Sequence, residues 1–165
     1  MAARLLIPVL LTALALCAQT QSAAPAYADA DLMAWSGFFH WVNWYESIAD
    51  RDAAQGYSDA TARGQIQRAA GLTTAETAAL KTVAADWKAQ WDAIMVTTKS
   101  MMANGATAKT SPALMAVRNQ RDAMIADHIN QILAAFGASE FARLSSYVHR
   151  PQASTGITVP WKAGR

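Results

Sequence analysis

The chain has 165 residues, of which 53% are hydrophobic and 16% are charged, and its formal net charge at pH 7 is +2. This near-neutral balance, with no block of lysine and arginine, argues against a nucleic-acid-binding protein and against a polybasic membrane patch. The length suits one domain that can bury a core, and the many alanines with few β-branched runs favour helices.

The first 28 residues indicate a secretory signal peptide. Arg4 precedes an apolar run, residues 5–16, and small residues then lead to Ala26-Tyr27-Ala28, an A-x-A cleavage pattern. The run is too short for a membrane span, which needs about 20 apolar residues. We expect cleavage after Ala28, or alternatively after Ala18, and hence a periplasmic or secreted protein.

Cys17 is the only cysteine of the chain. The preceding residues resemble a bacterial lipobox, but a lipobox has a small residue just before the cysteine and Leu16 is large, so we do not expect a lipid anchor at Cys17. If the leader is removed after either alanine, the mature chain has no thiol for a disulfide, a nucleophile or a metal site.

The first predicted helix, residues 31–54, concentrates the aromatic residues. Six of the fourteen Phe, Trp and Tyr residues fall within eleven positions: Trp35, Phe38, Phe39, Trp41, Trp44 and Tyr45. At 100° per residue, one broad apolar face contains Trp35, Phe38, Phe39, Val42, Tyr45 and Ala49. A second, adjoining face contains Met33, Trp41, Trp44 and Ile48, and only a narrow stripe is polar: Ser36, His40, Asn43 and Ser47. A helix that is apolar around most of its circumference is buried on several sides or lies at an interface.

We expect the two apolar faces of this helix to have different roles. The face with Phe38, Val42 and Tyr45 should close the core, where aromatic side chains bury the most area per residue. The second face remains without a partner, which marks an interaction site. The predicted partner- or ligand-binding residues are therefore Met33, Trp41, Trp44 and Ile48.

Four further helices are predicted along the chain. A short helix over residues 57–70 is weakened by Gly64 and closed by Gly71. Thr73 and Glu76 form a capping box that begins a long helix ending at Ala103. Ser111 and Pro112 begin the next helix, which runs to residue 137, and a last helix covers residues 139–149.

Together these elements predict an all-α helical bundle over residues 29–150. The two long helices are joined by a short loop and must form an antiparallel hairpin. The aromatic N-terminal helix and the short helices pack on this hairpin. Residues 151–165 form an irregular tail, whose Trp161 either docks on the bundle or belongs to a disordered segment.

The sequence contains no recognisable catalytic or metal-binding constellation. His40, His128 and His149 lack metal-ligand spacing, and motifs for nucleophilic catalysis or phosphate binding are missing. The methionines favour a role as core gap-fillers over soft-metal binding. Carboxylates at the end of the first helix (Glu46, Asp50 and Asp52) indicate a solvated helix end, and the i,i+4 pairs Lys88–Asp92 and Arg118–Asp122 indicate surface decoration. We expect no catalytic residue, no cofactor and no metal site.

Two resemblances rest on short segments. The capping-box segment Leu72-Thr73-Thr74-Ala75-Glu76 resembles the LTxxQ-type motif of Spy/CpxP-like periplasmic helical proteins, with Glu76 in place of Gln; that family includes envelope-stress chaperones and metal-resistance accessory proteins. The wider pattern resembles a group of uncharacterised secreted bacterial helical proteins, through Phe38-Phe39-His40-Trp41-Val42, then Ala70-Gly71-Leu72-Thr73, and finally Glu140-Phe141-Ala142-Arg143-Leu144. The second resemblance implies no activity.

These observations predict a non-enzymatic extracytoplasmic protein. Its expected function is to bind a protein partner or an apolar client through a helical surface, in the manner of a chaperone. One alternative is a structural or assembly subunit of an envelope or secreted complex. Another is a carrier of a small apolar ligand. The chain could form a homo-oligomer in either case. We expect no nucleic-acid partner and no membrane span.

Overall fold

The computed structural model describes residues 27–106 and 111–150, and these residues form five helices without any strand. They are α1 (Asp29–Ala54), α2 (Ala60–Arg63), α3 (Gln65–Ala70), α4 (Thr74–Ala103) and α5 (Pro112–Val148). The predicted all-α helical bundle is confirmed. The tail, residues 151–165, and the expected leader up to residue 26 lie outside the described residues.

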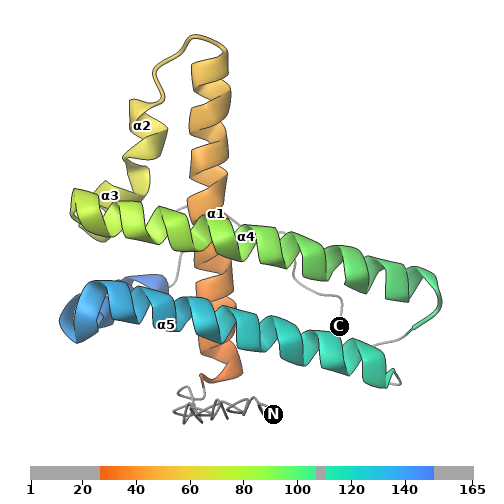
Figure 1. The fold of residues 1–165 in the computed structure, drawn as a ribbon. Coiled ribbons are helices and arrows are strands. Elements are labelled where there is room, and N and C mark those ends of the chain that lie inside the picture. Colours follow the sequence, from red (N-terminus) through yellow and green to blue (C-terminus); the bar gives the residue numbers. More distant parts are fainter. Residues whose placement is uncertain (1–26, 107–110, 151–165) are drawn as a thin grey trace, which may run out of the picture.

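The helices form a hairpin with one helix laid across it. Figure 1 shows α4 and α5 side by side, with the chain running in opposite directions along them, and α1 crossing behind both. The short helices α2 and α3 return the chain from the end of α1 to the start of α4. The last turns of α4 and the first turns of α5 extend beyond the crossing point, so α1 does not cover that end of the hairpin.

The helix boundaries follow the capping signals of the sequence. Thr73 Oγ1 accepts a hydrogen bond from the Glu76 backbone N–H at 3.2 Å, and Glu76 Oε2 accepts one from the Thr73 N–H at 2.7 Å, which is the predicted capping box of α4. Ser111 caps α5, with Pro112 in the first turn. The expected helix over residues 57–70 is instead two short helices, because the chain is interrupted at Gly64.

Helix α5 changes direction at Gly137, where the sequence predicts a helix end. Gly137 has φ 75° and ψ 165°, a conformation that residues with a Cβ avoid. The segment after this bend turns back onto α1. There Phe141 stacks on Trp35 with ring centroids 5.5 Å apart and an interplanar angle of 5°, and Leu144 is fully buried. The bend therefore lets the two helical parts of α5 pack on different sides of α1.

The core lies where α1 crosses the hairpin. Trp35, Phe38 and Phe39 of α1 are buried, and Phe39 lies 5.6 Å from the ring of Trp87 on α4 and 6.3 Å from that of His128 on α5. Aromatic pairs at such separations add about 0.5–1.5 kcal/mol beyond the area that they bury. The predicted core face of α1 is thus the face that joins all three long helices.

The carboxylates at the end of α1 belong to an ion-pair network and are not simply solvated. The Arg63 guanidinium contacts Asp59 at 2.6 Å, Asp50 at 2.8 Å and Glu46 at 3.1 Å, and Lys81 of α4 contacts Glu46 at 2.8 Å. The hydrogen bonds that the Arg63 guanidinium donates to the carboxylates of Asp59 and Asp50 raise the pKa of Arg63, and the bond to Asp59 lowers the pKa of Asp59. This network ties α2 to α1 and α4.

Candidate functional site

The four predicted binding residues of α1 do not form one exposed surface. Trp41 is only 6% exposed, because the segment after the bend at Gly137 brings Tyr147 onto it, with ring centroids 6.3 Å apart. Its indole Nε1 is buried and has no hydrogen-bond partner in the described part of the chain. The expectation that Trp41 is an open interaction residue is therefore corrected: in this structure it is a core residue.

The other three predicted residues differ in their surroundings. Trp44 is 50% exposed, and its one close aromatic neighbour is Tyr45, at 4.9 Å between centroids. Ile48 is half-buried, one helical turn further along. Met33 is also half-buried, but it lines a cavity on the side of α4. Of the four residues Trp44 alone is exposed, and a binding role for the three that are not in the core stays a prediction.

The polar stripe of α1 lies largely against α4. Asn43 Nδ2 donates hydrogen bonds to the carbonyl oxygens of Phe39 and of Ala84 on α4, both at 2.8 Å. The His40 ring packs edge-on against Trp87 at 4.6 Å and Trp91 at 5.1 Å. These side chains therefore position α1 across the hairpin, Asn43 through hydrogen bonds that satisfy its partly buried amide and His40 through ring packing.

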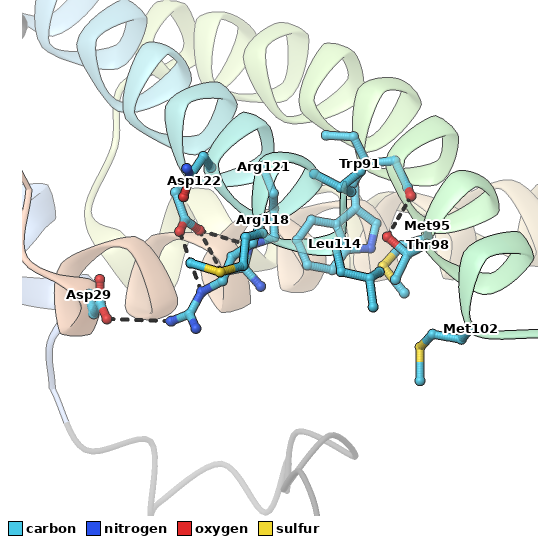
Figure 2. A pocket seen from close by; sticks show the side chains of 13 residues that line it. Asp29, Trp91, Met95, Thr98, Met102, Leu114, Arg118, Arg121 and Asp122 are labelled. Carbon is cyan, nitrogen blue, oxygen red and sulfur yellow. Dashed lines mark hydrogen bonds and ion pairs between the residues drawn. The ribbon is translucent and has the colours of Figure 1, made fainter. Parts of the chain in front are cut away.

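A larger site occurs at the end of the hairpin that α1 leaves uncovered. A cavity of about 810 Å³, which we call the hairpin groove, lies between the last turns of α4 and the first turns of α5, as Figure 2 shows. Its volume falls within the range of ligand-binding sites, about 300–1,000 Å³. Its apolar lining residues are Trp91, Ile94, Met95, Met102, Leu114, Met115 and Val117.

Charged side chains follow one edge of the hairpin groove. Arg118 contacts Asp29 at 3.6 Å and Asp122 at 3.9 Å, and Arg121 Nε donates to Asp122 Oδ1 at 2.8 Å (Figure 2). Asp29 is the first residue of α1, so the start of that helix marks one end of the groove. The groove is consequently an apolar surface with a polar border, which is typical of a binding site.

The sequence contains the residues of the hairpin groove but does not reveal their exposure. Trp91, Ile94, Met95 and Met102 lie on one helical stripe of α4, and such a stripe predicts core. The lengths of the helices are the signal that separates these residues from core residues. Helices α4 and α5 have 30 and 37 residues, and α1, with 26 residues, crosses the hairpin that they form. A single crossing helix cannot cover both ends of such a long hairpin. Two lining methionines, Met102 and Met115, are in fact 60% and 59% exposed.

A smaller cavity of about 290 Å³ adjoins the hairpin groove and shares Trp91, Met95 and Arg121 with it. We call it the His40 cavity. Its other lining residues are Met33, Ser36, His40 and Ile125. It lies between α1, α4 and α5, at the inner end of the groove.

The three histidines have different bonding patterns. His128 is buried, with Nδ1 at 2.7 Å from the Met124 carbonyl oxygen and Nε2 at 3.0 Å from Asp86 Oδ2. His149 likewise contacts the Ser145 carbonyl oxygen through Nδ1 and Asp31 through Nε2, at 2.7 and 2.9 Å. Both therefore use both ring nitrogens within the fold.

His40 is the exception among the histidines. Its contacts in the described residues are with aromatic rings, and no hydrogen bond to either ring nitrogen is found there. Burial lowers the pKa of His40, and the charge of Lys88 lowers it further, while Asp92 opposes the shift. The shift favours the neutral imidazole, and within residues 27–106 and 111–150 neither ring nitrogen is used in a hydrogen bond.

Within residues 27–106 and 111–150, no group of three or more His, Cys, Asp and Glu side chains is arranged to hold a metal ion. No helix in this part of the chain combines the length and the apolar character that crossing a membrane requires. Comparisons of the chain with models of protein families, with curated proteins and with solved structures find no match.

Proposed function

We propose that this protein is a non-enzymatic, extracytoplasmic binding protein that holds apolar segments of client proteins in the hairpin groove, as a chaperone does. The observation that carries the proposal is the groove itself: an apolar cavity of about 810 Å³ at the end of a helical hairpin that no other described element covers. The location outside the cytoplasm rests on the leader-like first 28 residues.

The methionines of the groove favour a client that varies in shape. Met95, Met102 and Met115 line it, and methionine side chains have three rotatable bonds and a polarizable sulfur. Surfaces rich in methionine can repack around different apolar partners, which is why promiscuous binding proteins use them. A groove between two helices suits an amphipathic helical segment, whose apolar side chains would enter at i, i+3 or i+4 and i+7.

The test is a pair of charge substitutions that differ only in their relation to the groove. Met115→Asp places a carboxylate at the exposed edge of the groove, and Val96→Asp places one at a position that is 69% exposed but outside its lining. We expect the purified protein and the Val96→Asp variant to suppress aggregation of an unfolded client protein, and the Met115→Asp variant to lose most of this effect. Equal suppression by both variants would exclude the groove as the client site.

A photo-crosslinking amino acid at position 102 gives an independent readout. Crosslinks to the same unfolded client should form from position 102 and not from position 96, because Met102 borders the groove and Val96 does not. Thermal unfolding of each variant verifies that it is folded. If the wild-type protein neither suppresses aggregation nor crosslinks to clients, the proposed function is wrong.

The volume of the groove also favours a second candidate, a carrier of a small apolar ligand. A cavity of about 810 Å³ lies within the range that accommodates a drug-sized molecule. Native mass spectrometry of the protein purified from its natural source tests this function. A bound molecule that Met115→Asp displaces would support a carrier, whereas protein that arrives free of ligand would count against one.

A further inference from the structure

The His40 cavity brings together three uncharged side chains that are ligands for soft metal ions. Met33 and His40 come from α1, and Met95 comes from α4. We propose that this cavity is a binding site for a soft monovalent cation, Cu(I) or Ag(I), with the thioether sulfurs of Met33 and Met95 and the imidazole of His40 as its ligands. The cavity shares Met95 with the hairpin groove, but the proposal does not rest on client binding there.

The donor atoms of the cavity determine which kind of ion it suits. Among the described residues, its lining contains two thioethers, one imidazole and the hydroxyl of Ser36, but no carboxylate. Mg²⁺ and Ca²⁺ require oxygen ligands, and carboxylates above all. Thioether ligands select Cu(I) among the metal ions that proteins bind. The lining therefore favours a soft cation over a hard one.

His40 is the only histidine of the described residues that can serve as a ligand without breaking a hydrogen bond. His128 and His149 each use both ring nitrogens within the fold, whereas His40 is held by aromatic packing against Trp87 and Trp91. A metal ion binds imidazole through a nitrogen lone pair, and no hydrogen bond within the described residues occupies the ring nitrogens of His40.

The two methionines can approach the imidazole from two directions. Met33 and His40 are seven residues apart on α1, so they lie two turns apart at the border between the second apolar face and the polar stripe, and Met95 lies on the facing helix. Methionine has enough rotatable bonds for both sulfurs to move toward a common ion. Trp91, at 5.1 Å from the His40 ring, adds an indole that attracts a cation and excludes water.

Arg121 also lines the cavity and is the residue that opposes a cation there. Its guanidinium, however, donates to Asp122 Oδ1 at 2.8 Å, and that carboxylate compensates the positive charge. A second basic residue near His40, Lys88, forms an ion pair with Asp92. The charges around the cavity are therefore balanced, and a monovalent ion suits this balance better than a divalent one.

The experiment is Ag(I) titration of the purified protein, followed by isothermal calorimetry and native mass spectrometry. Cys17 is replaced by Ser wherever the purified chain retains the leader, because a free thiol would bind Ag(I) on its own. We expect one Ag(I) per chain, and a loss of affinity of roughly tenfold or more in the double variant Met33→Leu/Met95→Leu. Leucine conserves the volume of methionine, so this variant should stay folded, which its melting temperature verifies.

The matched control is the double variant Met102→Leu/Met115→Leu, which removes two exposed methionines of the hairpin groove and leaves the His40 cavity intact. It should bind Ag(I) as the Cys17→Ser protein does. X-ray absorption of the Cu(I)-loaded protein should show sulfur and nitrogen neighbours. Absence of Ag(I) binding, equal losses in the two double variants, or a coordination shell of oxygen alone would each overturn the proposal.

Discussion

Replacing Trp41 and Trp44 by alanine, one at a time, compares two tryptophans that lie one helical turn apart on α1. Trp41 is 6% exposed and Trp44 is 50% exposed. A tryptophan buries about 200 Å² when it is fully covered, so Trp41 removes roughly 90 Å² more apolar surface from water. At about 25 cal/mol per Å², this area corresponds to about 2 kcal/mol.

Two further effects act on Trp41 alone and oppose each other. The cavity left by the missing indole adds to the cost of Trp41→Ala. The indole N–H of Trp41 has no hydrogen-bond partner in the described residues, so its removal regains about 1–3 kcal/mol. The change in helix propensity is the same at both sites and cancels. We therefore expect Trp41→Ala to destabilise the protein by about 2 kcal/mol more than Trp44→Ala does.

Urea-induced unfolding, monitored by far-ultraviolet circular dichroism, measures the free energy of unfolding of both variants and of the wild-type protein. Equal m-values would show that the variants unfold as the wild type does, so that the midpoints can be compared. If Trp44→Ala costs as much as Trp41→Ala, or more, the packing of Tyr147 on Trp41 described above is incorrect.

Three other predictions concern the helix ends and pH. Thr73→Ala should lower the free energy of unfolding by about 1 kcal/mol, measured in urea, because α4 loses its cap. Acidification from about pH 7 to about pH 5 should destabilise the protein, because His40 takes up a proton more readily in the unfolded chain than in the folded one. Its ordinary pKa is about 6.5, and burial lowers the pKa of the folded ring. Melting temperatures measured across this pH range should depend less on pH in the His40→Gln variant. A chain that begins at Asp29 lacks the hydrogen bond of 2.8 Å that the Tyr27 hydroxyl donates to Asn130. We therefore expect it to be less stable, by about 1 kcal/mol or more, than a chain that begins at residue 19, and a comparison of their melting temperatures tests this.

The sequence predicts the helices well because their ends are determined locally. The capping box of Thr73 and Glu76 begins α4 where expected, and Ser111 with Pro112 begins α5. Gly137 interrupts α5 as predicted: its non-helical φ and ψ separate the first part of α5 from a second helical part, where the sequence places a last helix. These signals depend on residues within a few positions of one another, so one sequence is enough to identify them.

The exposure of the predicted binding residues agrees with the helical period only in part. Trp44 and Ile48 lie where the helical period places them, at the surface or half-buried, but Trp41 is covered by Tyr147, more than a hundred residues along the chain. The hairpin groove was missed because its residues continue the apolar stripe of α4, and periodicity does not distinguish a covered stripe from an open one. The sequence also does not predict the ion-pair network around Arg63. Its members come from separate segments of the chain, and no local pattern shows that these segments meet.

The sequence by itself therefore determines the all-α class, the helix ends and the hairpin, because each depends on local capping, on helical period or on a short connection. Only the tertiary structure decides which apolar residues are covered. That outcome depends on where α1 crosses the hairpin and on how the bend at Gly137 returns the chain over α1, and both arise from packing between segments far apart in the sequence. The same crossing buries Trp41 and leaves the hairpin groove open.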